Sequence, residues 1–267
     1  MKNDMHKAAL IVPRLTADTN VNLTTILRLA TDAVKAGVSL ILLPEAALTG
    51  LINNDDPIHD LSLGQEVPGP ITDILGSFCL RHSVWMGIGM LERKDNQLFD
   101  SAILLDQNGA IALKHRRNQP QWHGRKADPS VYRQGSHIAK AETPFGSVAF
   151  LICGDLFDDS ILSRFKELKS DWLLFPFARS FTDGTSNQQR WETEELPLYR
   201  QRVKMAGAPA LMVNYLADNN LPWDNSFGGA FFVSAHGEVM ASHPLGREGI
   251  LTFNLEIHRL DRNDDAT

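Results

Sequence analysis

The sequence has few of the features that mark specialised classes of protein. It contains only two cysteines, Cys79 and Cys153, which is too few for a disulfide-stapled secreted scaffold and is typical of a reducing compartment. The apolar run at residues 8–12 is too short for the core of a signal peptide, and no segment approaches the ~20 apolar residues of a membrane span. These absences predict a cytoplasmic protein with no membrane partner.

The sequence also lacks an excess of positive charge. Its 26 Lys and Arg face 32 Asp and Glu, for a net charge of -6, so no overall field would attract a nucleic acid backbone. With 43% hydrophobic and 22% charged residues, the composition is that of a folded globular protein. Because no repeat or linker interrupts the 267 residues, we predict a single domain over residues 1–267.

Apolar runs and helical periodicities alternate along the chain, which predicts an α/β fold with mixed sheets. Asp106 to Gly109 form a turn signal between two of the strands and predict a hairpin there. About a dozen strands are expected in all. The main predicted strands are 8–12, 38–43, 84–91, 102–106, 110–115, 147–153, 172–177, 210–214, 229–234, 238–242 and 250–255, and the predicted helices are 21–34, 70–82, 160–168 and 190–206.

Several of these strands end in polar groups, and the carboxyl ends of strands are where open α/β sheets bind ligands. Glu45 follows one apolar run and Cys153 follows another. A cysteine acts as a nucleophile only as a thiolate, and a carboxylate in a desolvated pocket can accept the thiol proton. The two residues are therefore a candidate base and nucleophile.

The motifs around these residues resemble those of the nitrilase superfamily of carbon–nitrogen hydrolases over essentially the whole chain. LPEAALTG at 43–50 is similar to its glutamate motif, and LICGDLFDD at 151–159 is similar to its cysteine motif. LLFPFA at 173–178, an arginine-rich helix, Asn214 and GGAFFVSAHGEVMA at 228–241 follow in the family's order. The pattern is nearest to the Nit-type and ω-amidase-like amidases. The resemblance implies a four-layer α-β-β-α sandwich that forms a homodimer back to back, and a Glu–Lys–Cys triad.

The catalytic cation is the point where the sequence departs from this pattern. The position at which the resemblance places the catalytic lysine holds Arg117, and Lys114 occupies an earlier, normally non-catalytic position. Side chains alternate along a strand, so Lys114 and Arg117 should face opposite sides and only one should reach the thiol. Either residue is a candidate cation. The structural alternative is that both lie on a solvated basic strand edge.

The remaining candidates come from the same comparison. Counting back from Gly135, the position of a further family glutamate holds Asp128, a candidate for orienting the cation, and the backbone N–H of Gly154 is a candidate oxyanion donor. No paired-histidine, CxxC, GxGxxG or P-loop spacing is present, so no metal or organic cofactor is expected. The candidate substrate-binding residues are Phe177, Arg179, Trp191 and Tyr215.

These residues predict a cysteine-dependent hydrolase of a small-molecule amide that works through a thioester acyl-enzyme. If Arg179 points into the pocket, it would favour substrates that carry a carboxylate. Two alternatives remain open. A nitrile hydrolase or esterase would use the same thiol, whereas a catalytically impaired binding or scaffold protein would explain Arg117 at the lysine position.

Overall fold

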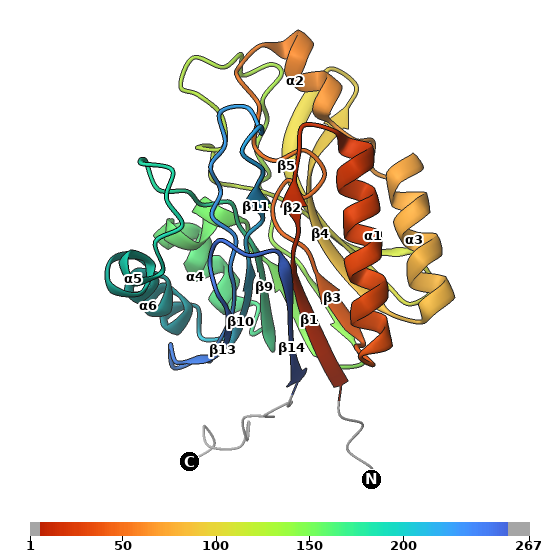
Figure 1. Ribbon diagram of the computed structural model, residues 1–267, viewed down its shortest axis with the longest axis vertical. Helices are drawn as coiled ribbons and strands as arrows, with labels where there is room; N and C mark the ends of the chain where they lie inside the picture. Colours follow the sequence, from red (N-terminus) through yellow and green to blue (C-terminus); the bar gives the residue numbers. More distant parts are fainter. Residues whose placement is uncertain (1–5, 256–267) are drawn as a thin grey trace.

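The computed structural model describes residues 6–255, which form two six-stranded mixed sheets packed face to face (Figure 1). The first sheet has the order β14 (Gly249–Leu255), β1 (His6–Val12), β3 (Leu40–Leu42), β4 (Trp85–Lys94), β5 (Gln97–Leu105), β6 (Ile111–Arg116). The second has the order β13 (Val239–His243), β12 (Ala230–Val233), β10 (Ala210–Val213), β9 (Trp172–Pro176), β8 (Gly146–Phe150), β7 (Lys140–Thr143). A short parallel pair, β2 (Arg14–Leu15) and β11 (Leu216–Ala217), lies apart from both.

Helices cover the outer face of each sheet, as Figure 1 shows. α1 (Thr19–Lys35) and α3 (Pro70–His82) pack on the first sheet, and α4 (Asp159–Glu167) and α6 (Leu196–Ala206) pack on the second. The predicted α-β-β-α sandwich is therefore confirmed. The shorter helices are α2 (Pro57–Leu63), α5 (Gln188–Arg190), a 3-10 helix (Cys153–Phe157) and a π-helical turn (Trp191–Glu195).

The residues of β1 show why this arrangement forms. Ala8, Leu10 and Val12 point between the two sheets, whereas Ala9 and Ile11 point toward α1 and α3. Both faces of the strand are thus apolar and both are covered, so a continuous apolar run is required rather than an alternating one. Asp18 then caps α1 by accepting the amides of Asn20 and Val21, which fixes where the chain turns back over the sheet.

The antiparallel strands β4, β5 and β6 place the polar residues that matter for the site. Ala102 lies opposite His115 on β6, with both side chains toward the second sheet, whereas Ser101 lies opposite Arg116 on the outer face. Arg117 directly follows β6, and its amide donates to the carbonyl of Asp100 at 2.8 Å. Asp100 and Arg117 therefore continue the inward-facing set.

The predicted elements are present with shifted bounds, and several additional ones appear. The predicted helix over 190–206 is divided into α5, the π-helical turn and α6, and β5 begins at Gln97 rather than at 102. α2, β2, β7 and β11 were not predicted. The polar segment at 261–267 lies outside the described residues. Within residues 6–255, no helix combines the length and the apolar character needed to cross a membrane.

Candidate active site

Glu45 lies at the end of the first sheet, in a tight turn that follows β3. Ala46 has a left-handed backbone with φ 45°, which turns the chain sharply after the carboxylate. A Cβ at Gly89 would lie 2.6 Å from the Cα of Glu45, so only glycine lets β4 approach this closely. The side chain of Glu45 is fully buried.

The structure places Arg117 directly against this carboxylate. Its Nη1 donates to Glu45 Oε1 at 2.9 Å and to Asp100 Oδ2 at 3.3 Å, and its Nη2 donates to Gln119 Oε1 at 2.8 Å. Only 4% of the Arg117 side chain is exposed. One guanidinium therefore lies between two buried carboxyl groups, where its fork of donors holds several acceptors at once.

Cys153 begins the 3-10 helix that follows β8, in a left-handed conformation with φ 43°. A residue other than glycine is strained there, and such strain is common where a nucleophile projects from a sharp turn. The half-buried thiol donates to the carbonyl of Ala178 at 3.5 Å. A Cβ at Gly154 would lie 2.5 Å from Arg117 Nη2, so the chain next to the thiol lies directly against the guanidinium.

Asp155 ties the segment after β6 to the segment that carries Cys153. Its Oδ1 accepts the amides of Asn118 and Gln119 at 2.9 and 2.8 Å. Its Oδ2 lies 2.8 Å from His115 Nε2 and accepts the amide of Ile152 at 3.2 Å. A fully buried carboxylate with these four partners fixes the nucleophile and the cation relative to each other.

The electrostatics of the cluster set the protonation of its acids. Burial, followed by the charge of Cys153, raises the pKa of Glu45 to about 8, although Arg117 acts to lower it. Burial and the Glu45 carboxylate also raise the pKa of Asp100 well above its ordinary value. The pKa of Arg117 rises despite desolvation because negative groups surround it, so the guanidinium stays charged. Glu45 thus combines a near-neutral pKa with a buried position, as a general base requires.

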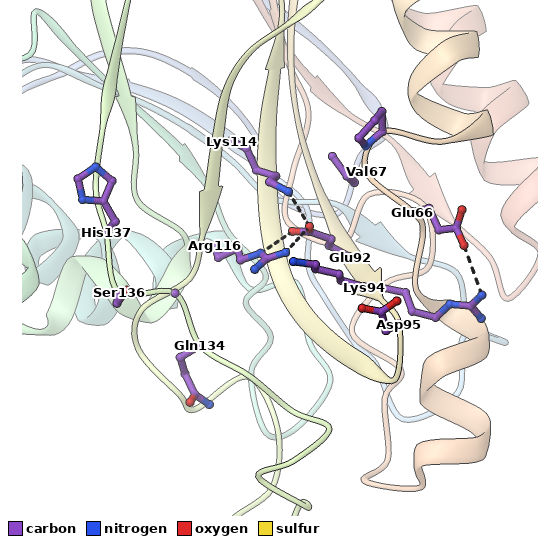
Figure 2. Close-up of a pocket in the computed structure, with 13 residues that line it drawn as sticks. Glu66, Val67, Glu92, Lys94, Asp95, Lys114, Arg116, Gln134, Ser136 and His137 are labelled. Atoms are coloured by element: carbon purple, nitrogen blue, oxygen red, sulfur yellow. Dashed lines mark hydrogen bonds and ion pairs between the residues drawn. The ribbon is translucent and has the colours of Figure 1, made fainter.

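Lys114 is not part of this cluster, because it points to the opposite face of the first sheet. Its Nζ donates to Glu92 Oε1 at 2.7 Å, and Arg116 binds the same carboxylate through Nε and Nη2 at 2.9 and 2.6 Å. Figure 2 shows both cations turned toward Glu92. The three residues line a surface pocket of about 700 Å³. Of the two candidate cations, only Arg117 is brought to Glu45. The interpretation as a solvated basic edge does not fit Arg117, which is buried. It does fit Lys114, which is exposed on the edge strand β6 with Glu92 as its partner.

Asp128 also lies away from the cluster. It is exposed and caps a surface turn by accepting the amide and hydroxyl of Ser130 at 2.8 and 2.7 Å. The carboxylate that contacts the cation is instead Asp100, on β5.

The predicted substrate-binding residues divide into core and surface. Phe177 and Trp191 are stacked and fully buried in the core beneath α6, and Tyr215 is buried with its hydroxyl donating to Asp224 and accepting from the Leu51 amide. Phe177 and Trp191 belong to the core cluster between the second sheet and its helices, whereas Tyr215 belongs to a small separate cluster with Leu15, Ile52 and Leu221.

Arg179 is the remaining predicted substrate-binding residue, and it is half-exposed near the thiol. It is engaged by Glu195, which accepts from its Nε at 2.8 Å and from its Nη2 at 2.5 Å. Its charge is therefore already compensated by a neighbouring carboxylate.

Sequence reasoning missed Asp100, Gln119 and Asp155 as members of the site. The signal for Asp155 was present, since it belongs to the motif at 151–159. The signal for Asp100 was its position opposite Arg117, which required the correct start of β5. Within residues 6–255, no group of three or more His, Cys, Asp or Glu is arranged to hold a metal ion.

Comparison with known proteins gives matches in sequence and in fold. The family model described as carbon–nitrogen hydrolase matches residues 7–262. A deaminated glutathione amidase of Yersinia enterocolitica is 25% identical over 169 residues, covering 60% of this chain and 57% of the relative. The chain spans about half the length of the curated relatives it matches.

Two solved structures share the fold at low sequence identity. A carbon–nitrogen hydrolase from Helicobacter pylori G27 matches with a TM-score of 0.82 and 18% identity, covering 96% of this chain and 90% of that one. A mutant of the amidase from Nesterenkonia sp. AN1, with acrylamide added to its active-site cysteine, matches with a TM-score of 0.76 and 16% identity, covering 94% and 93%. The two structures share the fold, and the match of the family model over residues 7–262 shows that the chain belongs to the carbon–nitrogen hydrolase family.

Proposed function

We propose that this protein is a cysteine-dependent amidase that hydrolyses a small-molecule amide through a thioester acyl-enzyme. The observation that carries the proposal is the buried ion pair between Glu45 and Arg117, at 2.9 Å, placed against the strained turn that presents Cys153. Base, cation and nucleophile are three different chemical functions, and acyl transfer needs all three. The amidase names of the Yersinia and Nesterenkonia relatives support an amide as the substrate.

In the first half of the proposed reaction, Glu45 accepts the thiol proton of Cys153, and the thiolate attacks the amide carbonyl carbon. The guanidinium of Arg117 and the backbone N–H of Gly154, at the start of the 3-10 helix, stabilise the oxyanion. Glu45 then gives its proton to the leaving nitrogen, the carbon–nitrogen bond breaks, and ammonia or an amine departs. The acyl group remains on the sulfur as a thioester.

In the second half, Glu45 accepts a proton from water and the resulting hydroxide attacks the thioester carbonyl. The carbon–sulfur bond breaks, the carboxylic acid is released, and the proton on Glu45 returns to the sulfur. No redox or group-carrier step is needed, so we expect no organic cofactor. Arg117 suits its role because it keeps its charge throughout the cycle.

Two measurements test the proposal. First, release of the carboxylic acid product is followed with a panel of small neutral and carboxylate-bearing amides, nitriles and esters, for the wild type, Cys153→Ala and the matched control Cys79→Ala. Cys79 is fully buried, so the control should keep activity, whereas Cys153→Ala should lose it. Preferential turnover of nitriles or esters would favour those activities on the same thiol.

Second, alkylation of the thiols by iodoacetamide is followed by mass spectrometry across pH. Cys79 is an internal reference, because burial raises its pKa to about 12. We expect Cys153 to react at least about a hundredfold faster, since only thiolates react. Equal slow reaction of both thiols, with no turnover of any substrate, would favour a binding or scaffold protein instead.

We also propose a cytoplasmic homodimer formed through the outer helical layer of the second sheet. The support is the family resemblance together with half-exposed apolar residues on that face, Phe157, Leu198 and Met205. Light scattering coupled to size-exclusion chromatography tests this association. The substitution Leu198→Glu should convert a dimer into a monomer. A variant that keeps the mass of the dimer would exclude this face as the dimer interface.

A further inference from the structure

We propose that Asp100 is a positioning residue of this site: it keeps its proton while Glu45 is ionised, and donates it to the Glu45 carboxylate in a hydrogen bond. The inference rests on the proposed function, since it assigns Asp100 to the base of that reaction. Asp100 lies on β5, directly opposite Arg117, and is 1% exposed. The motif comparison gave this position no role.

The first argument is the hydrogen bonding of the two carboxyl groups. Each accepts from Nη1 of Arg117 through one oxygen, and each has a second buried oxygen, Glu45 Oε2 and Asp100 Oδ1, with no donor among the described residues. Because Glu45 Oε1 and Asp100 Oδ2 both accept from the same nitrogen atom of Arg117, the two carboxyl groups are immediate neighbours. Two ionised carboxylates have only acceptors, so a contact between them requires a proton.

The second argument is the balance of charge around Asp100. Glu45 faces it from the turn after β3, Arg117 from the end of β6, and Asp155, which is held by His115, from the 3-10 helix. If both Asp100 and Glu45 were ionised, three buried carboxylates would surround one guanidinium. One retained proton reduces this excess, as in other carboxyl pairs that share a site.

The third argument decides which carboxyl keeps the proton. Arg117 Nη1 is 2.9 Å from Glu45 but 3.3 Å from Asp100, so the guanidinium stabilises an ionised Glu45 more strongly. The negative charge of Asp155 acts further on Asp100 and favours its protonated form. Glu45 therefore ionises first, with Asp100 as its donor, and is held ready to accept the thiol proton.

The proposal predicts different effects for two substitutions at Asp100. Asp100→Asn keeps the shape and supplies a permanent N–H donor, so it mimics the protonated acid. Asp100→Ala removes the proposed donor to the Glu45 carboxylate, which should raise the pKa of Glu45. Ser101→Ala is the matched control, because Ser101 is the next residue of β5 and points to the other face, toward Glu92.

The experiment measures iodoacetamide alkylation of Cys153 against pH in the wild type and the three variants. We expect Asp100→Asn to leave unchanged the midpoint, which is the pH at which Cys153 is alkylated at half its maximal rate, and to keep the rate itself within about threefold of the wild type. We expect Asp100→Ala to slow the reaction at neutral pH by about tenfold and to raise the pH of the midpoint. The control should behave as the wild type. A midpoint lowered by about one pH unit or more in the Asp100→Asn variant, or no effect of either substitution at Asp100, would overturn the proposal.

Infrared spectroscopy gives a second reading that does not depend on the stability of the Asp100→Ala variant. At pH 9 the wild type should show the carbonyl stretch of a protonated carboxylic acid, sensitive to deuterium exchange, that Asp100→Asn removes and the control Ser101→Ala retains. Its absence from the wild type would overturn the assignment. Because neither readout uses turnover, a wild type that hydrolyses no amide would reject the proposed function while leaving this test intact.

Discussion

Replacing Arg117 by Gln tests whether one guanidinium holds the site together. The substitution leaves Glu45 and Asp100 without their buried cation and removes donors at 2.9, 3.3 and 2.8 Å. Where both partners are ionised, breaking a buried pair by removing one partner costs about 3–5 kcal/mol of unfolding free energy. Loss of a preorganised oxyanion donor lowers kcat by about 10²–10³.

The loss of unfolding free energy in Arg117→Gln should depend on pH, and the pKa of Glu45 determines whether the loss grows or shrinks as the pH rises. Below about pH 8 Glu45 is largely protonated in the folded wild type, so losing the cation forfeits little charge–charge attraction. As pH rises through about 8 the wild type ionises and gains the ion pair, whereas the variant resists ionisation. The difference in unfolding free energy should therefore be larger at pH 9 than at pH 6, by about 1.4 kcal/mol for the one pH unit above 8.

Urea unfolding at pH 6 and pH 9 measures the stability, and alkylation of Cys153 with amide hydrolysis measures the site. Arg116→Gln is the matched control, because Arg116 also binds a buried carboxylate, but on the outer face. The control should lose stability while its folded protein keeps the wild-type reactivity of Cys153. An Arg117→Gln protein with wild-type reactivity, or a stability loss equal at both pH values, would refute the reasoning.

The same geometry makes three further predictions. The value of kcat/KM should rise with pH to a plateau above about 8, since Glu45 must be ionised to act as base; a profile that falls between pH 6 and 8 would contradict this. Asp155→Asn should slow alkylation of Cys153 about tenfold and lower the melting temperature, because it weakens the shared anchor of nucleophile and cation; an unchanged rate would remove that role. Glu195→Gln should free Arg179 and raise kcat/KM for carboxylate-bearing amides about tenfold relative to neutral ones, and equal changes for both substrate classes would exclude Arg179 from the pocket.

Much of the fold could be predicted because its signals are local. The apolar run of β1 and the periodicity of α1 are read directly from neighbouring residues. β7 could not be predicted in this way, because its sequence Lys-Ala-Glu-Thr carries no apolar pattern and it forms a strand only by pairing with β8 at the edge of the sheet. α2 begins at a cap by Asp56, and its buried residue is Asp60. The burial of Asp60 depends on tertiary contacts and could not be read from neighbouring residues.

The site could be predicted only in part. The alternation of side chains along a strand correctly predicted that Lys114 and Arg117 face opposite sides of the sheet. It could not predict which of them faces Glu45, because Lys114 is held on the outer face by Glu92 of β4, a residue distant in sequence. Asp128 was chosen by counting from a glycine, and the intervening loop places it on a surface turn. Asp100 was missed because the predicted strand began at 102, so its position opposite Arg117 was not available.

The buried carboxylate of Asp155 has a consequence for how such a site changes over evolutionary time. By holding the backbone next to both Arg117 and Cys153, it makes the candidate site one rigid unit in which a change at one residue disturbs the others. The half-exposed Arg179, by contrast, is bound chiefly by the partly buried Glu195. Under the proposed function, single substitutions at that pair would alter the substrate preference, whereas a change in the chemistry would require several residues to change together.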